Sequence, residues 1–562
     1  MASVLKLRRG NRIQNNVFTG AEGELSYDST AKKIRVHDGI TLGGKMLVSE
    51  IVSVNDFGAV GDGVTDDTAA IQAAINSGAK VVDFEQGKTY LVNDMLSLVN
   101  NVSLRGNKAV IYTPTPIHDA GTGVFTIDSG DPSMQLSNIS ISNFKFIGKS
   151  TFSEHRHIIA IHGGNNISIT DNYFYGFPGD AIYINGGDGY AAERHNYHVK
   201  ISNNIIDGVN YENRNAVSIL DCDGLIISDN IFSRCSRADM PGAIDIEPNP
   251  GAYTVYAIVR NILINSNVFD RVKGANGDIS IVLSTGFTTY PSNIVINNNV
   301  SNSISAFGQS IAFYCQVPTS VDNFAVVSNH ITNNSIGVSN ESILRNTVFS
   351  SNIAGNFYVD TGGSAGYLVN CHIVNNRFKF LLATSHSNDH LVVAGNIIDQ
   401  LNYSGAAVSI NLYGTYLNVQ NNITANSKNA QSIVMRSNSP KTNIFKDNNL
   451  DIAPSIHAFK TDDCRNVTNT TTALTFNTDT LPSVFPIGES TAYLNGDTGL
   501  PSGYGSTIGT LKCYNYSGIR ANIYQHFYPY QTSLSLGAYF IREALQASDS
   551  WTGWYLINTT AV

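Results

Sequence analysis

The chain has 562 residues with a formal net charge of −9, and only 14% of its residues are charged. Its Lys and Arg residues form no basic stripe, which argues against nucleic acid as a partner, and no run of eighteen apolar residues indicates a membrane span. Abundant Asn, Ser, Gly and Thr beside so few charges favour an all-β protein, because helices place Glu, Lys, Leu and Ala on their surfaces. The opening MASVLKLRRGN has no apolar core, so we expect no secretory signal.

Residues 1–50 form a first module. Short strands are expected near residues 24–27 and 33–36, joined by turns that contain glycine. The phrases FTGAEGEL and RVHDG resemble the small N-terminal domain of many bacteriophage tail fibres and tailspikes. That resemblance implies attachment to the virion or to a phage tail or baseplate protein, and a place of action outside the host cell, at its surface.

Residues 51–100 are expected to hold a cap helix and the first strands of a solenoid. The stretch GDGVTDDT leads into a short helix that Asp66 or Asp67 caps, with Ile71 and Ile75 on one apolar face. This segment resembles the start of the pectate-lyase-like superfamily, which includes phage tailspikes and polysaccharide-cleaving β-helix enzymes. In such a fold the helix covers the open end of the apolar core.

A repeat dominates residues 101–465. An alternating apolar run, an Asn and another apolar residue recur near Asn172, Asn204, Asn230 and Asn267, at intervals of roughly twenty to forty residues. Each unit is too short to bury its own apolar face, so successive units must stack. The period of two and the many β-branched residues predict strands.

We therefore predict a right-handed parallel β-helix. Asn suits the turn because it tolerates the left-handed conformation, and stacked Asn side chains could hydrogen-bond along the axis. The alternative is a β-sandwich or propeller with Asn-rich hairpins, but the irregular spacing argues against propeller blades.

Residues 466–562 are predicted to form a C-terminal β domain that trimerises the protein or binds glycan. Dense aromatic residues with period-two alternation indicate strands. The module resembles C-terminal domains of phage tail proteins in which a Gln, an Arg and a WxxW pair recur; the matching residues are Gln525, Arg542, Trp551 and Trp554. The tailspike resemblance as a whole implies a homotrimer.

The chemistry is expected in the phrase GAIDIE, residues 242–247. In a strand, Ile244 and Ile246 point into the core, and Asp245 and Glu247 then point outward, about 7 Å apart. Like charges held this close raise one pKa, which suits a general acid beside a base.

Alignment of the inward apolar pairs compares this strand with its neighbours. Asp245 then falls level with Ser218 in NAVSIL, with Tyr183 in DAIYIN and with Ser280 in DISIVL, so only this coil carries two acids. Asp221 follows the strand one coil earlier, which predicts that it lies beside Glu247.

The resemblance to polysaccharide-cleaving tailspikes, which use Asp/Glu pairs, adds roles. Glu247 is expected to be the general acid, with Asp245 or Asp221 as base or nucleophile. The residues expected to bind substrate are Asp223, Glu212, Arg214, Arg237, Tyr183 and Tyr211. The competing interpretation is that the acids merely bind a loop backbone or an ion. No cofactor and no metal site is predicted, because the cysteines are scattered and the histidines near residue 157 lack an acidic or Cys partner.

The predicted function is that of a phage tailspike depolymerase, an endo-glycosidase acting on host capsule or O-antigen. A polysaccharide lyase is the second hypothesis; it would use a base and a charge neutraliser such as Arg237, Arg271 or Lys273. A non-catalytic adhesin that only grips glycan is the third.

Overall fold

The structure is a computed structural model. The residues it describes are 7–30, 32–47, 50–114, 121–131, 133–149, 155–186, 194–248, 257–283, 291–305, 307–359, 366–385, 387–401, 408–429, 432–436, 444–452, 455–457, 467–468, 488–495, 508–515, 523–529, 539–543 and 555–557.

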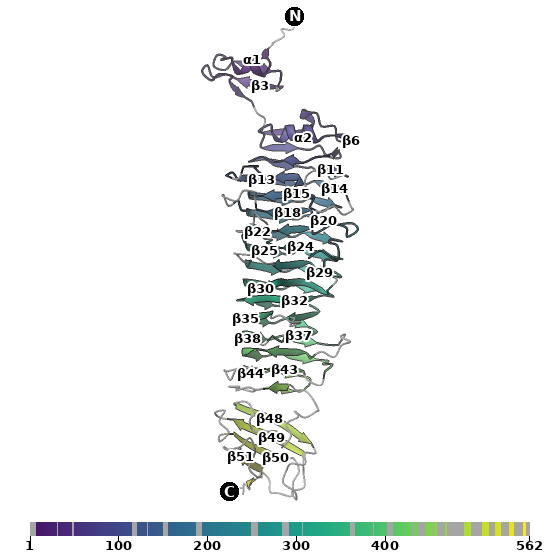
Figure 1. The fold of residues 1–562 in the computed structure, drawn as a ribbon, viewed down its shortest axis with the longest axis vertical. Helices are drawn as coiled ribbons and strands as arrows, with labels where there is room; N and C mark the ends of the chain where they lie inside the picture. Colours follow the sequence, from purple (N-terminus) through teal and green to yellow (C-terminus); the bar gives the residue numbers. More distant parts are fainter. Residues whose placement is uncertain are drawn as a thin grey trace.

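The molecule is a long rod made of three parts stacked end to end (Figure 1). A small sheet with one helix lies at the N-terminal end; it contains β1 (Arg8–Gly10), α1 (Arg12–Asn16), β2 (Leu25–Asp28), β3 (Lys33–Val36) and β4 (Lys45–Met46). A solenoid of parallel strands follows. An antiparallel sheet ends the chain; it contains β48 (Gly488–Asn495), β49 (Ile508–Asn515), β50 (Ile523–Pro529), β51 (Tyr539–Glu543) and β52 (Tyr555–Ile557).

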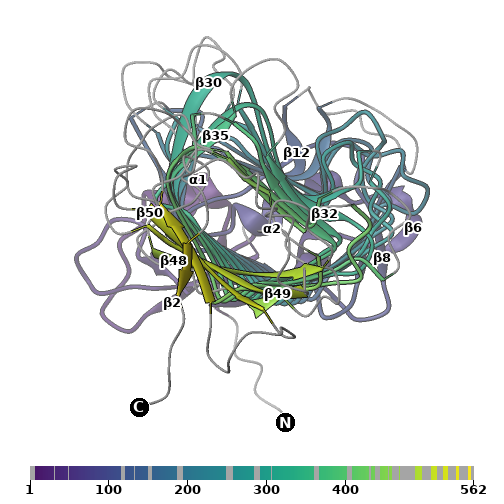
Figure 2. The same cartoon turned by 90° about the horizontal axis from the view of Figure 1, so that it is seen from below.

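The solenoid is a parallel β-helix, the fold class that the sequence predicts. Each coil contributes up to three strands, and every strand pairs in parallel with its counterpart in the next coil. Seen along the axis, the coils superimpose around a common interior (Figure 2). That interior is filled by Ile, Val, Leu and Phe side chains, because single coils can bury these only by stacking.

The strands fall into three stacks. The first stack, which carries the candidate site, contains β12 (Gly123–Ile127), β15 (His157–His162), β18 (Ile182–Asn185), β21 (Val217–Ile219), β24 (Ile244–Ile246), β27 (Ile279–Leu283), the first part of β30 (Gln309–Val327) and of β32 (Ser335–Arg345), β34 (Asn356–Val359), β37 (Phe380–Ala383), β40 (Ile410–Tyr413), β43 (Ile433–Arg436) and β46 (Ser455–His457).

The second stack contains β10 (Ser103–Arg105), β13 (Leu136–Ser142), β16 (Gly164–Thr170), β19 (Tyr197–Ser202), β22 (Cys222–Ser228), β25 (Val259–Asn265), β28 (Ser292–Asn297), the later parts of β30 and β32, β33 (Val348–Ser350), β35 (Tyr367–Val374), β38 (Asp389–Ala394), β41 (Thr415–Gln420) and β44 (Ile444–Lys446).

The third stack contains β11 (Val110–Thr113), β14 (Lys145–Gly148), β17 (Tyr173–Tyr175), β20 (Ile205–Asp207), β23 (Ile231–Ser233), β26 (Val268–Asp270), β29 (Val300–Asn302) and β31 (His330–Ile331), and then β36 (Arg377–Phe378), β39 (Ile397–Asp399), β42 (Ile423–Ala425), β45 (Asn449–Leu450) and β47 (Val467–Thr468).

A ladder of buried Asn side chains joins the coils at the turn between the second and third stacks. In each coil the backbone N–H and the side-chain amide donate to the Oδ1 of the Asn in the following coil, at 2.9–3.1 Å. The ladder consists of Asn172, Asn204, Asn230, Asn267, Asn299, Asn329, Asn352, Asn376, Asn396, Asn422 and Asn448. The predicted stacking of these side chains is therefore confirmed, and it satisfies polar groups that would be costly to bury alone.

The sequence analysis placed the left-handed backbone conformation at the ladder asparagines, and this position is wrong by one residue. The left-handed conformation belongs to the residue before each ladder Asn, for example Asp171 (φ 60°), Asn203 (φ 56°) and Asp229 (φ 59°). The ladder Asn is thus selected for its hydrogen bonds, and the preceding residue turns the chain.

Short segments close the top of the solenoid and precede its first full coil. They are β5 (Ile51–Ser53), η1 (Val54–Phe57), β6 (Asp62–Asp66), α2 (Thr68–Ile75), β7 (Val81–Asp83), β8 (Thr89–Leu91) and β9 (Leu96–Ser97). In α2, Ile71 and Ile75 are buried as predicted. Asp66 accepts a hydrogen bond from the Thr68 N–H, whereas Asp67 makes no cap bond and receives the Val60 and Gly61 N–H groups instead.

In the C-terminal sheet, the Arg542 Nε atom donates to the buried Gln525 side chain at 2.8 Å. This pairs the two polar residues that the sequence singled out there. Trp551 and Trp554 lie outside the described residues. Within the described parts of the chain, no helix has both the length and the apolar character to cross a membrane.

Candidate functional site

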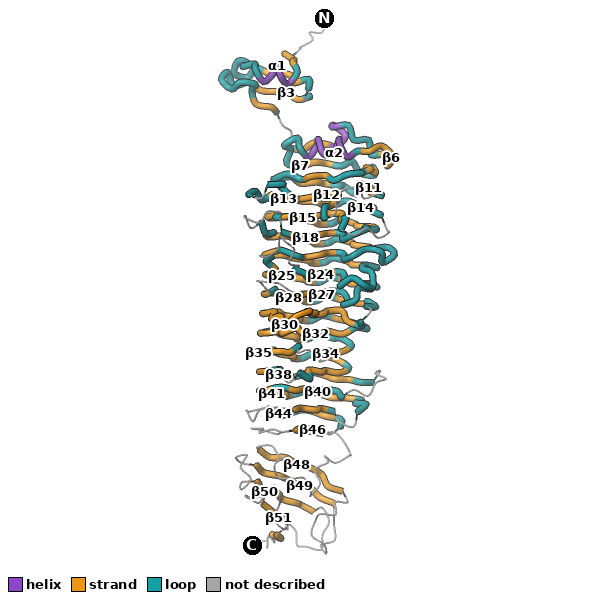
Figure 3. The backbone as a smooth tube through the Cα atoms, viewed as in Figure 1, coloured by secondary structure: helices purple, strands orange, loops and turns teal. Residues whose placement is uncertain are grey.

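The acidic phrase lies on β24, in the middle of the first stack (Figure 3). Ile244 and Ile246 are fully buried in the solenoid core, as predicted. Their acidic neighbours differ from each other: Glu247 is half-buried, whereas Asp245 is only 1% exposed. The prediction that both carboxylates project into solvent is therefore wrong for Asp245.

Polar side chains of the preceding coils account for the burial of Asp245. The Asn215 side-chain amide donates to the Asp245 carboxylate at 3.1 Å and also to the Ser218 hydroxyl at 3.1 Å. Asn215 precedes β21, so this contact crosses from one coil to the next. The acid is thus a buried and hydrogen-bonded group under the surface that Glu247 reaches.

The strand register around Asp245 agrees with the alignment made from the sequence. Asp245 pairs with Ser218 on one side and Ser280 on the other, and Tyr183 lies one strand beyond Ser218. Along this stack small hydroxyl residues flank the acid, and both serines are buried and contacted by asparagine side chains, Ser218 by Asn215 and Ser280 by Asn276.

The electrostatics of the pair favour a shared proton. Burial, the charges of Glu247 and Asp180 and a hydrogen bond with Glu247 together raise the pKa of Asp245 well above its ordinary value; the Arg214 charge opposes this rise. Two carboxylates in contact resist double ionisation, so the Asp245–Glu247 pair holds its last proton more tightly than an isolated carboxyl group does.

Asp180 is a third acid in this cluster, and its charge acts on Asp245. It is 1% exposed; its Oδ1 accepts the Asn215 N–H at 2.9 Å and lies 3.8 Å from Arg214 Nε. The His157 Nδ1 lies 3.3 Å from the Asp180 carboxylate, and the imidazole stacks on the Tyr183 ring at 4.3 Å. Asp180 stands two residues before β18, and Asn215 stands two residues before β21. This shared position in successive coils is the sequence signal that could have placed the two side chains together.

Asp221 is a buried acid whose carboxylate binds a turn. It is 1% exposed and accepts the backbone N–H groups of Asn196 and Ile258, both at 2.9 Å, while His195 Nδ1 lies at 2.7 Å. It therefore fixes the turn that leads into β22. Its role as base or nucleophile beside Glu247 stays a prediction.

Asp223 also lies away from the acidic pair. It stands on β22 in the second stack, with Arg260 at 2.8 Å and the Asn261 amide at 2.6 Å. Burial alone would raise its pKa, but these two partners lower it overall. Asp223 thus belongs to an ion pair in the second stack, and its assignment to substrate binding stays a prediction.

The remaining predicted binding residues gather on loops that precede β21 and β24. The Arg237 N–H donates to the Asn213 carbonyl at 3.0 Å, which places Arg237 beside the segment that carries Glu212 and Arg214. Arg237 contacts the exposed Asp239 at 3.1 Å, and both Arg237 and Arg214 lower the pKa of Asp239. We call Glu212, Arg214, Arg237 and Asp239 the charged rim.

Tyr211 stands next to this rim. The ammonium group of Lys273 lies 4.1 Å from the centre of its ring, and the backbone of Tyr211 is left-handed (φ 65°). Arg271 is instead bound to Asp270 at 2.6 Å on an exposed surface. Among the described residues, no group of three or more His, Cys, Asp or Glu side chains could hold a metal ion.

Two family models match this chain. Residues 5–41 match the Major tropism determinant N-terminal domain, and residues 51–131 match the rhamnogalacturonase A/epimerase, pectate lyase-like model. A tail spike protein of Escherichia virus K5 is 25% identical over 138 residues; the match covers 25% of this chain and 20% of that protein. The chain thus spans about a fifth of the length of this curated relative.

Solved tailspikes share the fold over almost the whole chain. The tailspike protein of E. coli bacteriophage HK620 in complex with a pentasaccharide is 15% identical, with a TM-score of 0.53; the match covers 92% of this chain and 93% of that one. A double mutant of the same tailspike gives a TM-score of 0.55 at the same identity and coverage. At this identity the likeness demonstrates a shared β-helix architecture.

Proposed function

We propose that this chain, a phage tailspike protein with a pectate-lyase-like β-helix, binds the surface polysaccharide of a host bacterium and hydrolyses it within the chain. The supporting observation is the Asp245–Glu247 pair, in which a buried acid of raised pKa contacts a carboxyl group that reaches the surface.

In this proposal Glu247 is the catalytic residue that protonates the glycosidic oxygen. The pair retains a proton more tightly than an isolated carboxyl group does, and Glu247 is its half-buried member, which a sugar can contact. When the proton leaves with the departing sugar, the glycosidic C–O bond breaks and the pair becomes doubly charged, so its proton affinity rises. The pair then accepts a proton from the water whose oxygen bonds to the anomeric carbon in place of the departed sugar, which restores the protonated pair.

Asp180 and Arg214 support this chemistry from below and beside the pair. The negative charge of Asp180 favours retention of the shared proton, while Arg214 opposes it. Their balance determines how far the pKa of Asp245 rises above its ordinary value. The charged rim and Tyr183 would contact the sugars on either side of the cleaved bond, with the tyrosine offering a flat apolar face.

We propose further that three copies assemble with their solenoids parallel. The outer face of the third stack carries a column of apolar residues in register, namely Ile205, Ile231, Val268 and Val300, each 41–46% exposed. A column with one apolar residue in each coil matches only a surface of the same pitch, which a parallel copy provides. The N-terminal module would attach this assembly to the phage tail.

The test uses the full-length protein incubated with a panel of bacterial capsule and O-antigen preparations. The variant Glu247→Gln should lower the cleavage rate about 10²–10⁴-fold, because it keeps the shape of the side chain and loses the proton. The matched control is Asp399→Asn, which alters an acid several coils away that faces Arg377. Wild-type cleavage by Glu247→Gln would refute the assignment.

Mass spectrometry of the released fragments separates the competing functions. A hydrolase releases oligosaccharides with new reducing ends, and a lyase releases products whose new double bond absorbs ultraviolet light. An adhesin leaves the polymer length unchanged. The raised pKa of the buried acid supports the hydrolase, because a hydrolase needs a group that can donate a proton to the glycosidic oxygen.

A further inference from the structure

His157 is a buried histidine at the start of β15, beside the acidic cluster. Its side chain is 0% exposed, and β15 pairs with β18, the strand that carries Tyr183 and follows Asp180. The sequence shows no acidic partner near this histidine, but the fold brings Asp180 to it from the next coil. Burial of a polar ring is costly unless its nitrogen atoms find partners, so the contacts of His157 indicate why it stands here.

The Nδ1 edge of the ring contacts Asp180. The Asp180 N–H donates to His157 Nδ1 at 3.1 Å, and one carboxylate oxygen of Asp180 lies 3.3 Å from the same nitrogen. The other carboxylate oxygen accepts the Asn215 N–H at 2.9 Å. His157 thus fixes the turn before β18 and holds the Asp180 carboxylate in its place beside Asn215.

Asp180 in turn acts on the acid pair. Asn215 links the two sites, because its N–H donates to Asp180 and its side-chain amide donates to Asp245 at 3.1 Å. The charge of Asp180 is one of the causes that raise the pKa of Asp245. A change that displaces or neutralises Asp180 therefore lowers the pKa of Asp245 toward its ordinary value.

The flat face of the same imidazole packs on Tyr183. The two ring centres lie 4.3 Å apart and the ring planes differ by 1°. Tyr183 is half-buried and lies two strands before Asp245 in the same column, with Ser218 between them. At the usual spacing of strands this separation is about 10 Å, so a polymer cleaved at Glu247 would also reach Tyr183.

We propose that His157 is a positioning residue that serves both halves of the site: its Nδ1 edge holds Asp180 for the acid pair, and its face holds the Tyr183 ring for the sugar. This inference rests on the proposed function. His157 is buried and acts only through these two neighbours. Because the two roles use different parts of one ring, they can be separated by substitution.

Two variants of the full-length protein separate the roles. His157→Asn places an amide where Nδ1 stands, so it keeps a polar contact for Asp180 and removes the ring that packs on Tyr183. His157→Phe keeps a flat ring and removes the polar contact. Both are assayed for kcat, KM and pH profile on the capsule or O-antigen preparation that the wild-type protein cleaves. His372→Asn and His372→Phe, at an exposed position of β35, are the matched controls.

The two variants should affect different parameters. His157→Asn should raise KM about two- to tenfold and keep the pH profile, because the aromatic contact that orders Tyr183 is lost. His157→Phe should keep KM and move the basic limb of the kcat profile by about 0.5–1 pH unit toward lower pH. The direction follows because a weaker charge on Asp180 lowers the pKa of the acid, which then loses its proton at a lower pH.

Similar changes of KM and pH profile in both variants, or no change in either, would show that His157 only fills space, and the proposal fails. If Phe prevents folding, His157→Asn decides alone: a raised KM with an unshifted profile supports the proposal, and any other result overturns it. Binding of the same polysaccharide in the Glu247→Gln background gives a readout besides cleavage, and His157→Asn should weaken it by the same factor. Wild-type cleavage by Glu247→Gln would instead contradict the proposed function.

Discussion

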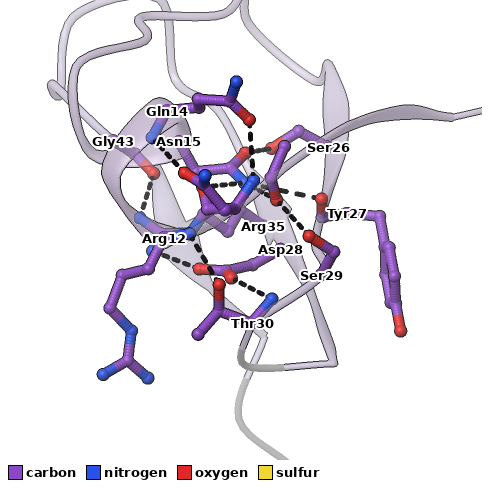
Figure 4. Close-up of polar contacts among 12 residues, drawn as sticks. Arg12, Gln14, Asn15, Ser26, Tyr27, Asp28, Ser29, Thr30, Arg35 and Gly43 are labelled. Carbon is purple, nitrogen blue, oxygen red and sulfur yellow. Dashed lines mark hydrogen bonds and ion pairs between the residues drawn. The ribbon is translucent and has the colours of Figure 1, made fainter.

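The solenoid and the N-terminal module bury opposite kinds of side chain. In the solenoid the interior is apolar, and polar side chains are admitted mainly where they continue from coil to coil, as in the Asn ladder. In the module the interior is polar and includes the Arg35 guanidinium, which is bound to the Asp28 carboxylate at 2.6 Å (Figure 4). The apolar residues of the module lie on the other face of the sheet, on α1 and in the following loop. Ile13, for example, is 78% exposed and Ile40 is 87% exposed.

This difference follows from where each region finds its neighbour. Each coil has another coil of the same chain above or below it. Its apolar side chains are therefore buried against a neighbour to which the coil is covalently joined. Among residues 7–30 and 32–47 of the small module, only polar residues and glycines are buried. The hydrogen-bonded network of these polar residues fixes the shape of the module, while the apolar contribution to stability must come from outside.

The largest effect is expected from removal of the buried anion in the module. Asp28→Ala leaves the Arg35 guanidinium buried without its carboxylate, which costs about 3–5 kcal/mol and should unfold the module locally. Limited proteolysis should then release the N-terminal segment while the solenoid remains intact. The double variant Asp28→Ala/Arg35→Met should lose less, because it removes both charges; equal loss would show that the ion pair is not the cause.

Replacement of a ladder Asn is expected to have the next largest effect on stability, in this case on the stability of the solenoid. Asn267→Ala removes the acceptor for both the backbone N–H and the side-chain amide of Asn230, so two buried donors lose their partner. The expected loss is about 2–4 kcal/mol, measured as faster unfolding in denaturant. The control is Asn265→Ala, a half-buried outward position at the end of β25 and two residues before Asn267, which should change little. An equal effect of the two variants would contradict the role of the ladder.

The sequence predicts those features that repeat in one dimension. The inward pair Ile244 and Ile246 and the register of Asp245 with Ser218 follow from alternation and from stacking, because each coil supplies the same pattern. The Asn ladder is predictable for the same reason. Its turn geometry was misplaced by one residue because Asn is common at both positions.

The candidate site depends on side-chain contacts between loops and strands of neighbouring coils, and the alternation of apolar and polar residues does not predict these contacts. Asp245 is buried because Asn215 crosses from the previous coil, and Asp180 joins the cluster by accepting the Asn215 N–H. The carboxylate of Asp221 is directed to the backbone of the next turn, because the chain turns sharply after β21. These contacts depend on how the loops between strands fold, and the repeat pattern does not specify that.

The smallest effect on stability, up to about 3 kcal/mol, is expected from replacement of Asp278, an acid buried in the otherwise apolar interior of the solenoid. Asp278 is buried beside Ser301, which occupies the position of Phe269 and Ile331 in the adjacent coils. Burial raises the pKa of Asp278 to about 6, although hydrogen bonds from Ser301, Ser303 and Ser310 work against the rise. The folded protein therefore holds this proton more tightly than the unfolded chain does.

It follows that the contribution of this group to stability is fully present below about pH 4, where both states are protonated, and is lost as the pH rises through 6. Asp278→Asn removes the ionisation and should stabilise the solenoid by up to about 3 kcal/mol at pH 8, with little gain at pH 4. The measurement is the unfolding rate in denaturant at both pH values. A gain of the same size at both would mean that packing, and not the buried charge, limits this coil. Asp270→Asn, on the exposed face of β26, is the control and should show no such pH dependence.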